Sequence, residues 1–405
     1  MCRYSAIYVT KPYFQLLMPC EDITQYMPST LNNIKAMLAR YDRLWIIIAW
    51  VIATFLLYLK FGVGFNLESV KYIREADHLI REQSFSQARY LFYLGTIAII
   101  ALNKLIGTGL YGAVLMIMLI NASAYLVFYR ALKIHFQSAF PALAIVFLLM
   151  GFWPYQQWSL FLYTECLFYS LLLFLFAHLL RVKKFNLKAV AGSLLLVLAL
   201  MITRPLGILF ALPVLLFFFT LMTRRQRILL WGFTLVAFAA GAWIIQVVFT
   251  TTPDWSMHRA VMEENIICDM TPPVITYQPD VTESRNPFYQ LFYYITHNFP
   301  HFAELALTRL RYFFGMIRPY YATTTNLFIG AYLLLMYLAI ISGFRKQRWV
   351  FPRGIRLFMW SSILLFALAI AVQCDDYHNR FFLALLPIIV TMAVGAIWQR
   401  RRVSS

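Results

Sequence analysis

The chain has 405 residues, of which 61% are hydrophobic and only 13% are charged. A soluble domain keeps about 25% of its residues charged, so this composition excludes an ordinary soluble domain and predicts a polytopic membrane protein. The formal net charge of +18 does not indicate nucleic-acid binding, because the positive residues stand in short groups between apolar runs.

The first 43 residues are polar and lack the apolar core of a signal peptide. We therefore expect a cytoplasmic N-terminal stretch over 1–43, without an assigned role, and a single transmembrane catalytic domain over 44–400. Neither GxGxxG nor GxxxxGK[ST] occurs, so no nucleotide cofactor is predicted. We interpret the cysteines as packing residues, because they form no CxxC pair and no metal spacing. They are Cys2, Cys20, Cys166, Cys268 and Cys374.

Apolar runs long enough to cross a bilayer, which takes about 20 residues, follow one another along the chain. They predict an all-α polytopic membrane protein with about ten transmembrane helices and with interfacial helices in the outer loops. The segment Leu91–Ile106 is too short to span, so we expect it to lie at the outer face. The predicted spans are 44–63, 109–129, 139–153, 158–180, 186–203, 205–222, 228–249, 325–343, 356–373 and 380–398.

The positive groups stand at the ends of these spans, which is typical of the cytoplasmic side of a membrane protein. With the N-terminus inside, every such group falls on the cytoplasmic side. The fourteen carboxylates after Asp42 then fall on the outer side or at outer span ends. Polar chemistry is therefore expected at the outer face, where two large loops lie, 64–108 and 250–324.

The first outer loop begins with a carboxylate-rich segment directly after the first span. On a helix, Glu68, Tyr72 and Glu75 share one face, and Asp77 points to the opposite side. One of these carboxylates could accept a proton from a hydroxyl group. The alternative is a solvated surface helix held by ion pairs between neighbouring turns.

Other polar groups stand at outer span ends. Ionisable residues at membrane depth are costly and are usually functional or paired, so Glu165 and Arg204 could also form a purely structural ion pair. Three such sites on one side of the membrane predict a shared pocket with the first loop. The residues are Glu165, at the start of the fourth span, Arg204, between the fifth and sixth, and Tyr377, His378 and Arg380, between the ninth and tenth.

The second outer loop ends in Arg309–Tyr321, where three arginines stand among five aromatic residues. Such a segment suits the headgroup region of a bilayer, with rings at the interface and guanidinium groups near phosphates. It is either an interfacial anchor or a site at which Arg318 recognises a lipid phosphate.

The first outer loop resembles that of the GT-C class of glycosyltransferases, which includes the protein O-mannosyltransferases and the aminoarabinose transferase of lipid A. These polytopic enzymes use polyprenyl-phosphate-linked sugars. The family usually has Asp where Glu68 stands and often Gly where Gln83 stands. The similarity covers about residues 44–400. The matching motifs are Glu68-Ser69-x-x-Tyr72-x-x-x-Ala76-x-x-Leu79, Thr164-Glu165, Arg204-Pro205, and Tyr377-x-x-Arg380 with Pro387.

The resemblance implies an inverting transfer of a sugar from a polyprenyl-phosphate donor to a glycan or lipid acceptor of the cell envelope. The enzyme would lie in the bacterial cytoplasmic membrane, with its active site on the periplasmic side. Glu68, or else Asp77, would deprotonate the acceptor. Charge on the leaving phosphate would be stabilised by Arg380, Arg204 or Arg318.

The remaining candidates would bind substrate. Glu165 and His378 would position sugar hydroxyls or the arginines, and Tyr72, Glu75 and Tyr377 stand in the same motifs. No closed set of metal ligands is predicted, although the scattered carboxylates could bind a divalent cation.

Two other classes of membrane protein remain open. A transporter or flippase of lipid-linked saccharides would show internal repeats and charges at the bilayer midplane. An O-antigen polymerase or ligase has many spans and an arginine-bearing outer loop, but gives no reason for a carboxylate helix after the first span.

Overall fold

The computed structural model describes residues 41–228, 264–268, 277–282, 284, 286–345 and 350–398. The chain divides into two units, Met1–Asp42 and Arg43–Ser405, and the site described below lies in the second. Every regular element among the described residues is a helix, and the only strand-like contacts there are two isolated bridges. The predicted all-α class is therefore confirmed for this part of the chain.

The first half of the described chain carries three short helices, α3 (Glu68–Glu82), η2 (Ala88–Tyr93) and α4 (Leu94–Leu105), between the two long helices α2 (Asp42–Phe61) and α5 (Gly109–Phe136). The elements that follow are α6 (Ala139–Gly151), α7 (Trp153–Gln156), η3 (Gln157–Leu160) and α8 (Glu165–Arg181).

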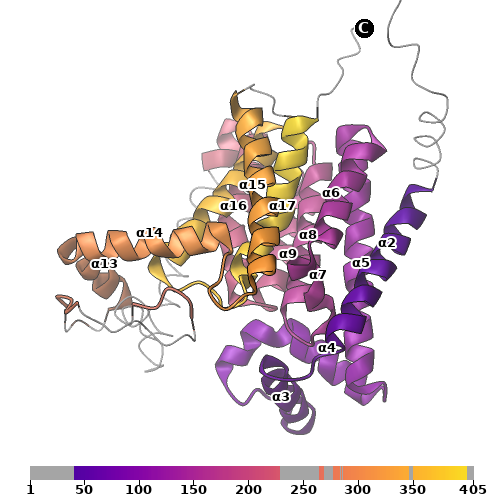
Figure 1. Ribbon diagram of the computed structural model, residues 1–405, viewed down its shortest axis with the longest axis horizontal. Helices are drawn as coiled ribbons and strands as arrows, with labels where there is room; N and C mark the ends of the chain where they lie inside the picture. Colours follow the sequence, from indigo (N-terminus) through magenta and orange to yellow (C-terminus); the bar gives the residue numbers. More distant parts are fainter. Residues whose placement is uncertain are drawn as a thin grey trace, which may run out of the picture. The chain divides into compact units, whose positions relative to one another are not determined.

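The second half ends in three long helices. The elements are α9 (Leu187–Met201), η4 (Pro205–Phe210), α10 (Ala211–Leu221), α13 (Pro287–His297), α14 (Phe299–Gly315), α15 (Thr323–Arg345), α16 (Arg353–Val372) and α17 (Arg380–Ile397). Figure 1 shows α3 and α4 together at one end of α5, and α13 and α14 to one side of the other helices.

Five of the described helices are long and apolar enough to cross a membrane: α2, α5, α15, α16 and α17. A sixth is reached if α6 and the segment Trp153–Leu160, bent by 72° relative to it, count as one span. The predicted number of about ten is thus not confirmed, because α9 and α10 are shorter and the predicted span 228–249 lies almost entirely outside the described residues. The predicted interfacial helix is α4, whose 12 residues are too few to span.

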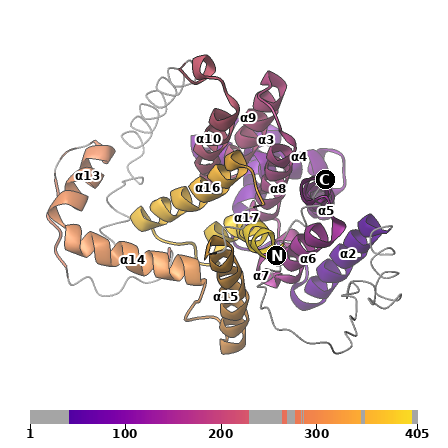
Figure 2. The same cartoon turned by 90° about the horizontal axis from the view of Figure 1, so that it is seen from above.

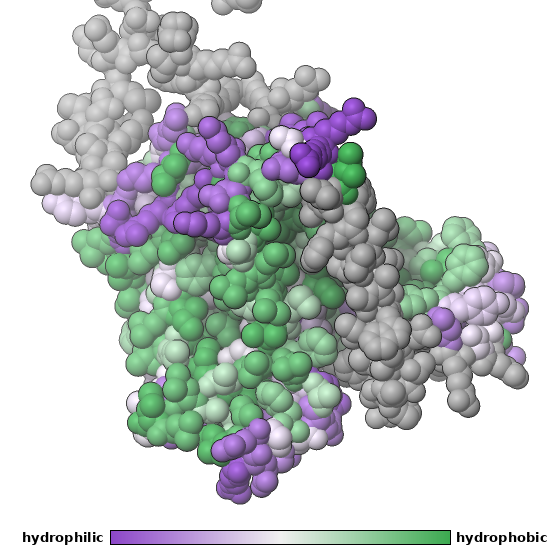
Figure 3. Space-filling model, turned by 180° about the vertical axis from the view of Figure 1, so that it is seen from behind, coloured by the Kyte–Doolittle hydropathy of each residue, from purple (hydrophilic) through white to green (hydrophobic). Residues whose placement is uncertain are grey.

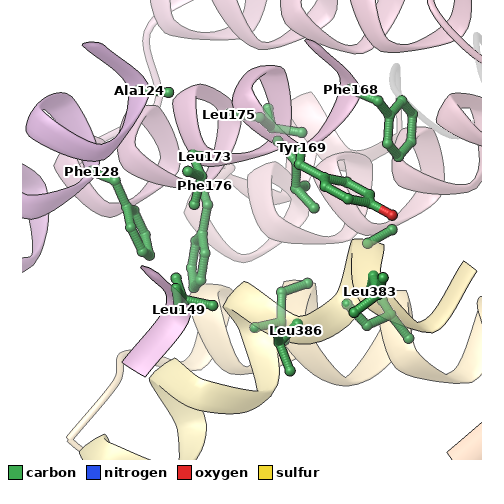
Figure 4. Packing of buried hydrophobic residues seen from close by; sticks show 14 of the residues in the cluster. Ala124, Phe128, Leu149, Phe168, Tyr169, Leu173, Leu175, Phe176, Leu383 and Leu386 are labelled. Carbon is green, nitrogen blue, oxygen red and sulfur yellow. The ribbon is translucent and has the colours of Figure 1, made fainter. Parts of the chain in front are cut away.

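Helix α17 lies among the other helices, with α6, α8, α15 and α16 around it (Figure 2). In α17, 83% of the most apolar stretch of 18 residues is buried inside the protein. In the other four long helices the corresponding share is 22–33%. A helix that is apolar all round and surrounded by others forms the core of the bundle. In Figure 4, Tyr169 of α8 lies above Leu383 of α17, and Phe176 of α8 lies beside Leu149 of α6.

The helices at the periphery of the bundle direct apolar side chains away from the protein. On the face in Figure 3, a broad hydrophobic surface lies between hydrophilic ends. Leu56 on α2, Leu115 on α5 and Leu335 on α15 are each more than half exposed. A soluble monomer rarely exposes such a large apolar surface, so these helices fit a bilayer.

A disulfide joins the second outer loop to the connection between α16 and α17. Cys268 is bonded to Cys374, 106 residues further along the chain. Beside it, the Cys268 amide donates to the Asp375 carbonyl (2.8 Å), and the Asp375 amide donates to the Ile266 carbonyl (2.9 Å). The interpretation of all cysteines as packing residues is wrong for this pair, because spacing along the chain does not show which loops meet.

Candidate functional site

Arg380, the first residue of α17, binds three carboxylates that come from three parts of the chain. Its Nη1 donates to Oε2 of Glu68 (2.8 Å) and to Oε1 of Glu165 (2.8 Å). Its Nη2 donates to Oε1 of Glu68 (3.1 Å), and its Nε donates to Oδ1 of Asp376 (2.7 Å). One guanidinium therefore joins the starts of α3, α8 and α17.

A second arginine closes the cluster from the turn between α9 and η4. Nη1 of Arg204 lies 2.5 Å from Oε1 of Glu165, and Nη2 lies 3.5 Å from Oδ2 of Asp376. We call these five residues the charge cluster. It holds three carboxylates and two guanidinium groups in direct contact: Glu68, Glu165, Arg204, Asp376 and Arg380.

The local backbone holds the cluster in place at unusual dihedral angles. Leu67, directly before Glu68, has φ of 50°, and Asn379, directly before Arg380, has φ of 60°. Asn tolerates this left-handed region, whereas Leu rarely adopts it. Backbone strain of this kind persists only where the surroundings impose it, and it often occurs at functional sites.

A short bridge fixes the first loop against the segment before α8. The Gly64 amide donates to the Leu160 carbonyl (3.1 Å), and the Leu162 amide donates to the Gly64 carbonyl (3.2 Å). A Cβ atom on Gly64 would collide with the ring of Phe161. Only glycine allows this close approach, which brings the start of α3 next to Glu165.

The members of the cluster differ in their access to solvent. The side chain of Glu165 is 0% exposed and that of Arg380 is 8% exposed, but that of Glu68 is 32% exposed. Glu68 is therefore the carboxylate that a bound substrate can reach.

The arginines keep Glu68 and Asp376 ionised. Burial raises the pKa of Glu68, but the hydrogen bond and charge of Arg380 outweigh it and leave the pKa below its usual value. Burial likewise opposes ionisation of Asp376, and Arg380 and Arg204 lower its pKa nonetheless. Both groups are carboxylates at neutral pH.

Aromatic rings cover one side of the cluster. The guanidinium of Arg380 lies 5.7 Å from the centre of the Trp158 ring, and the His378 ring also lies 5.7 Å from it, edge to face. Burial, followed by the charge of Arg380, lowers the pKa of His378, so its imidazole is neutral at pH 7. The buried indole N–H of Trp158 has no hydrogen-bond acceptor within the described part of the chain.

Three predicted site residues lie beside the cluster without joining it. Tyr72 is buried, and burial together with the charges of Glu165 and Glu68 raises its pKa. Tyr377 stacks on Tyr320 at 4.2 Å. His378 touches the cluster through its backbone amide, which donates to Oδ1 of Asp376 (3.0 Å).

The other predicted residues have partners elsewhere. Asp77 pairs with Lys104 of α4 at 2.6 Å. Glu75 accepts hydrogen bonds from the amide (2.7 Å) and hydroxyl (2.6 Å) of Ser86, which close the turn after α3. Arg318 is fully buried and pairs with Asp375. These contacts give Glu75 and Arg318 structural roles.

Helix α3 ends as glycine-terminated helices do, although no glycine is present. Gln83 adopts φ of 52° and ψ of 26°, and its amide donates to the Leu79 carbonyl. This left-handed conformation at a helix end is the one that favours glycine, so Gln83 holds a backbone conformation that glycine adopts more readily.

Asp376 is the member of the charge cluster that the sequence analysis does not predict as a site residue. It stands four residues before Arg380, the spacing at which side chains meet on a helix, and this spacing could have indicated the pair. Its link to Arg204, 172 positions earlier in the numbering, has no such local signal.

An apolar groove lies between α2 and α5. It encloses about 360 Å³, and its lining includes Trp50 and Phe55 of α2 and Leu115 of α5. Val63 and Leu160 line it as well, next to the Gly64 bridge. The groove therefore ends close in sequence to Glu68 and Glu165.

Among the described residues, no group of three or more His, Cys, Asp or Glu side chains is placed to hold a metal ion. The carboxylates of the cluster are instead bound to arginines.

No family model, curated protein or solved structure matches the chain. The chemistry of the site must therefore be argued from its own geometry.

Proposed function

We propose that the protein is an inverting glycosyltransferase that moves a sugar from a polyprenyl-phosphate donor to an envelope glycan or lipid acceptor at the outer face of the membrane. The observation that carries the proposal is the charge cluster. It combines a partly exposed carboxylate with buried guanidinium groups at one end of apolar helices. Transfer from a lipid phosphate needs both an acceptor for a proton and donors for a leaving phosphate.

In the proposed reaction, an acceptor hydroxyl attacks the anomeric carbon while the bond from that carbon to the phosphate oxygen breaks. The proton goes to Glu68, and the phosphate leaves with the bonding electrons. A carboxylate with a lowered pKa is a weak base, so Glu68 would orient the hydroxyl first and take its proton late. Asp77 suits this role less, because it pairs with Lys104 outside the cluster.

Arg204 suits the leaving phosphate better than Arg380 does. An arginine has five N–H donors, and Arg380 already directs four hydrogen bonds to carboxylates. Arg204 makes one short hydrogen bond, to Glu165, and keeps donors for a ligand. Arg380 would hold Glu68 and Glu165 in position.

Two further features support a lipid donor and an outer active site. The groove between α2 and α5 offers apolar space for a prenyl chain. The disulfide Cys268–Cys374 adjoins Asp375 and Asp376, and disulfides persist in oxidising compartments such as the periplasm. Both features agree with a periplasmic site in a bacterial cytoplasmic membrane.

The test is transfer by the purified protein in liposomes, supplied with a panel of radiolabelled prenyl-phosphate sugars. We expect one of them to be consumed and Glu68→Gln to abolish the transfer while the protein stays folded. Glu82→Gln, on the exposed end of the same helix, is the matched control and should remain active. Full activity of Glu68→Gln would contradict the assigned role.

The position of the cluster also separates the proposal from a transporter. Transporters bind substrate near the bilayer midplane, whereas the charge cluster stands at the ends of α3, α8 and α17. Export of a lipid-linked saccharide without cleavage of its phosphate bond would favour the transporter instead.

A further inference from the structure

A second cavity, far in sequence from the charge cluster, lies between the end of α15 and the start of α16. It encloses about 330 Å³ and is lined by Phe344, Arg353, Arg356, Leu357 and Trp360. The rings of Phe344 and Trp360 lie 5.3 Å apart and form an aromatic wall. Arginines and a tryptophan near the start of a membrane helix are typical of the level of lipid headgroups.

The cavity contains a charged side chain with an N–H group that lacks an acceptor in the described part of the chain, which favours binding of an anion. Nε of Arg356 is buried and has no acceptor within the described residues. A buried N–H without a partner costs free energy, more so when the group is charged. No carboxylate occurs in the sequence between Glu304 and Asp375, so neither α15 nor α16 carries an acid that could supply this charge.

The start of α16 adds to this preference. Its N-cap is Pro352, whose side chain forms no capping hydrogen bond. The first N–H groups of a helix point outward and carry partial positive charge, which favours an anion. Arg353, the first residue of α16, is exposed and stands beside these groups.

We infer that this cavity binds the phosphodiester headgroup of an anionic phospholipid on the side of the membrane opposite to the charge cluster. The two arginines would donate to the phosphate oxygens, and the aromatic wall would lie against the glycerol backbone. Guanidinium groups form strong charge-assisted hydrogen bonds with phosphates. Basic pockets between helices on the cytoplasmic side suit such headgroups.

The experiment uses the full-length protein in detergent and measures bound lipid by native mass spectrometry during titration with phosphatidylglycerol or phosphatidylcholine. We expect one phosphatidylglycerol to bind in preference to phosphatidylcholine. Arg353→Gln and Arg356→Gln should each weaken that binding about 10-fold, the loss of one hydrogen bond to a charged group. Arg130→Gln, an exposed arginine outside the cavity, removes the same charge and should leave affinity within about twofold.

Three outcomes would overturn the inference. They are equal binding of the two lipids, an equal loss in Arg130→Gln, and full displacement of the lipid by inorganic phosphate, which would identify a free anion as the ligand. Because Arg356 is partly buried and its variant could misfold, Arg353→Gln, on an exposed side chain, decides the matter independently. Size-exclusion chromatography of every variant checks that the fold is kept.

Discussion

Arg380 donates four hydrogen bonds to three carboxylates, and this sharing makes it the least replaceable residue of the cluster. Glu165 is completely buried, so loss of Arg380 would leave it paired with Arg204 alone. Removing one partner of a buried ion pair costs about 3–5 kcal/mol. Effects of Arg380 variants on activity are therefore mixed with effects on folding.

Arg204 allows a cleaner test of phosphate stabilisation. In Arg204→Gln, Glu165 keeps its bond to Arg380, so we expect the protein to fold. If Arg204 donates to the leaving phosphate, kcat should fall about 10²–10³-fold, as for the loss of one donor at a developing charge. Steady-state kinetics with the lipid donor measures this, and Arg181→Gln, on α8 at the other end, is the control. Unchanged kcat would remove Arg204 from the phosphate.

The lowered pKa of Glu68 predicts the shape of the pH profile. A group whose pKa is lowered on folding stays ionised until the pH falls below its usual value, which is 4.5 for a glutamate. We therefore expect kcat/KM to be constant between about pH 8 and about pH 5, where Glu68 is ionised. At lower pH, where Glu68 becomes protonated, kcat/KM should decrease. Since the ionised form is the paired one, the stability contributed by the pair is lost over the same low range. A drop in kcat/KM centred near neutral pH would instead indicate another base.

At the scale of elements, the disulfide fixes the loop beside the cluster. Cys374 directly precedes Asp375 and Asp376, which bind Arg318 and Arg380. We expect Cys268→Ser with Cys374→Ser to lower the free energy of unfolding by about 2–4 kcal/mol and to reduce transfer. Thermal unfolding in detergent and the liposome assay measure these effects. Reductant should impair the native protein and leave the double variant unchanged, and an effect of equal size on both would contradict this.

The groove between α2 and α5 makes a prediction about chain length. Leu115→Trp would fill part of the groove, whereas Leu119→Trp, one turn further along α5 and outside the lining, would not. We expect Leu115→Trp to raise KM for a long prenyl donor about 10-fold, roughly the burial of two CH₂ groups. KM for a short-chain donor should change little. Equal effects of the two variants would show that the prenyl chain binds elsewhere.

For the whole molecule, the central prediction is sidedness. Glu82→Cys on α3 and Arg130→Cys on α5, each in a background with Cys2→Ser and Cys20→Ser, report opposite ends of the helices. A membrane-impermeant maleimide should label the first in intact cells and the second only after permeabilisation, because positive groups remain in the cytoplasm. Labelling of both from outside would reverse the orientation on which the proposed active site depends.

Hydropathy predicted four of the five long helices within three residues of their observed ends, since burial in lipid demands continuous apolar runs. The predicted span 109–129 stops seven residues before the end of α5 at Phe136. The predicted position of Glu68, Glu165, Arg204 and Arg380 at span ends on one side of the membrane also predicted that they lie in one pocket. It could not show which of them touch, because Glu68 and Arg380 are 312 residues apart. For the same reason the disulfide was missed and Arg318 was assigned to a ligand, although it binds Asp375 inside the protein.

The sharing of one guanidinium among three segments also restricts how this sequence can change over generations. A single replacement at Arg380 leaves three acids with one arginine, whereas a replacement of any one acid leaves two acids with two arginines. Drift at these positions is therefore expected to proceed by paired, compensating exchanges, while Glu82 and other exposed positions vary freely. Homologues that lack the arginine should also lack at least one of its acidic partners.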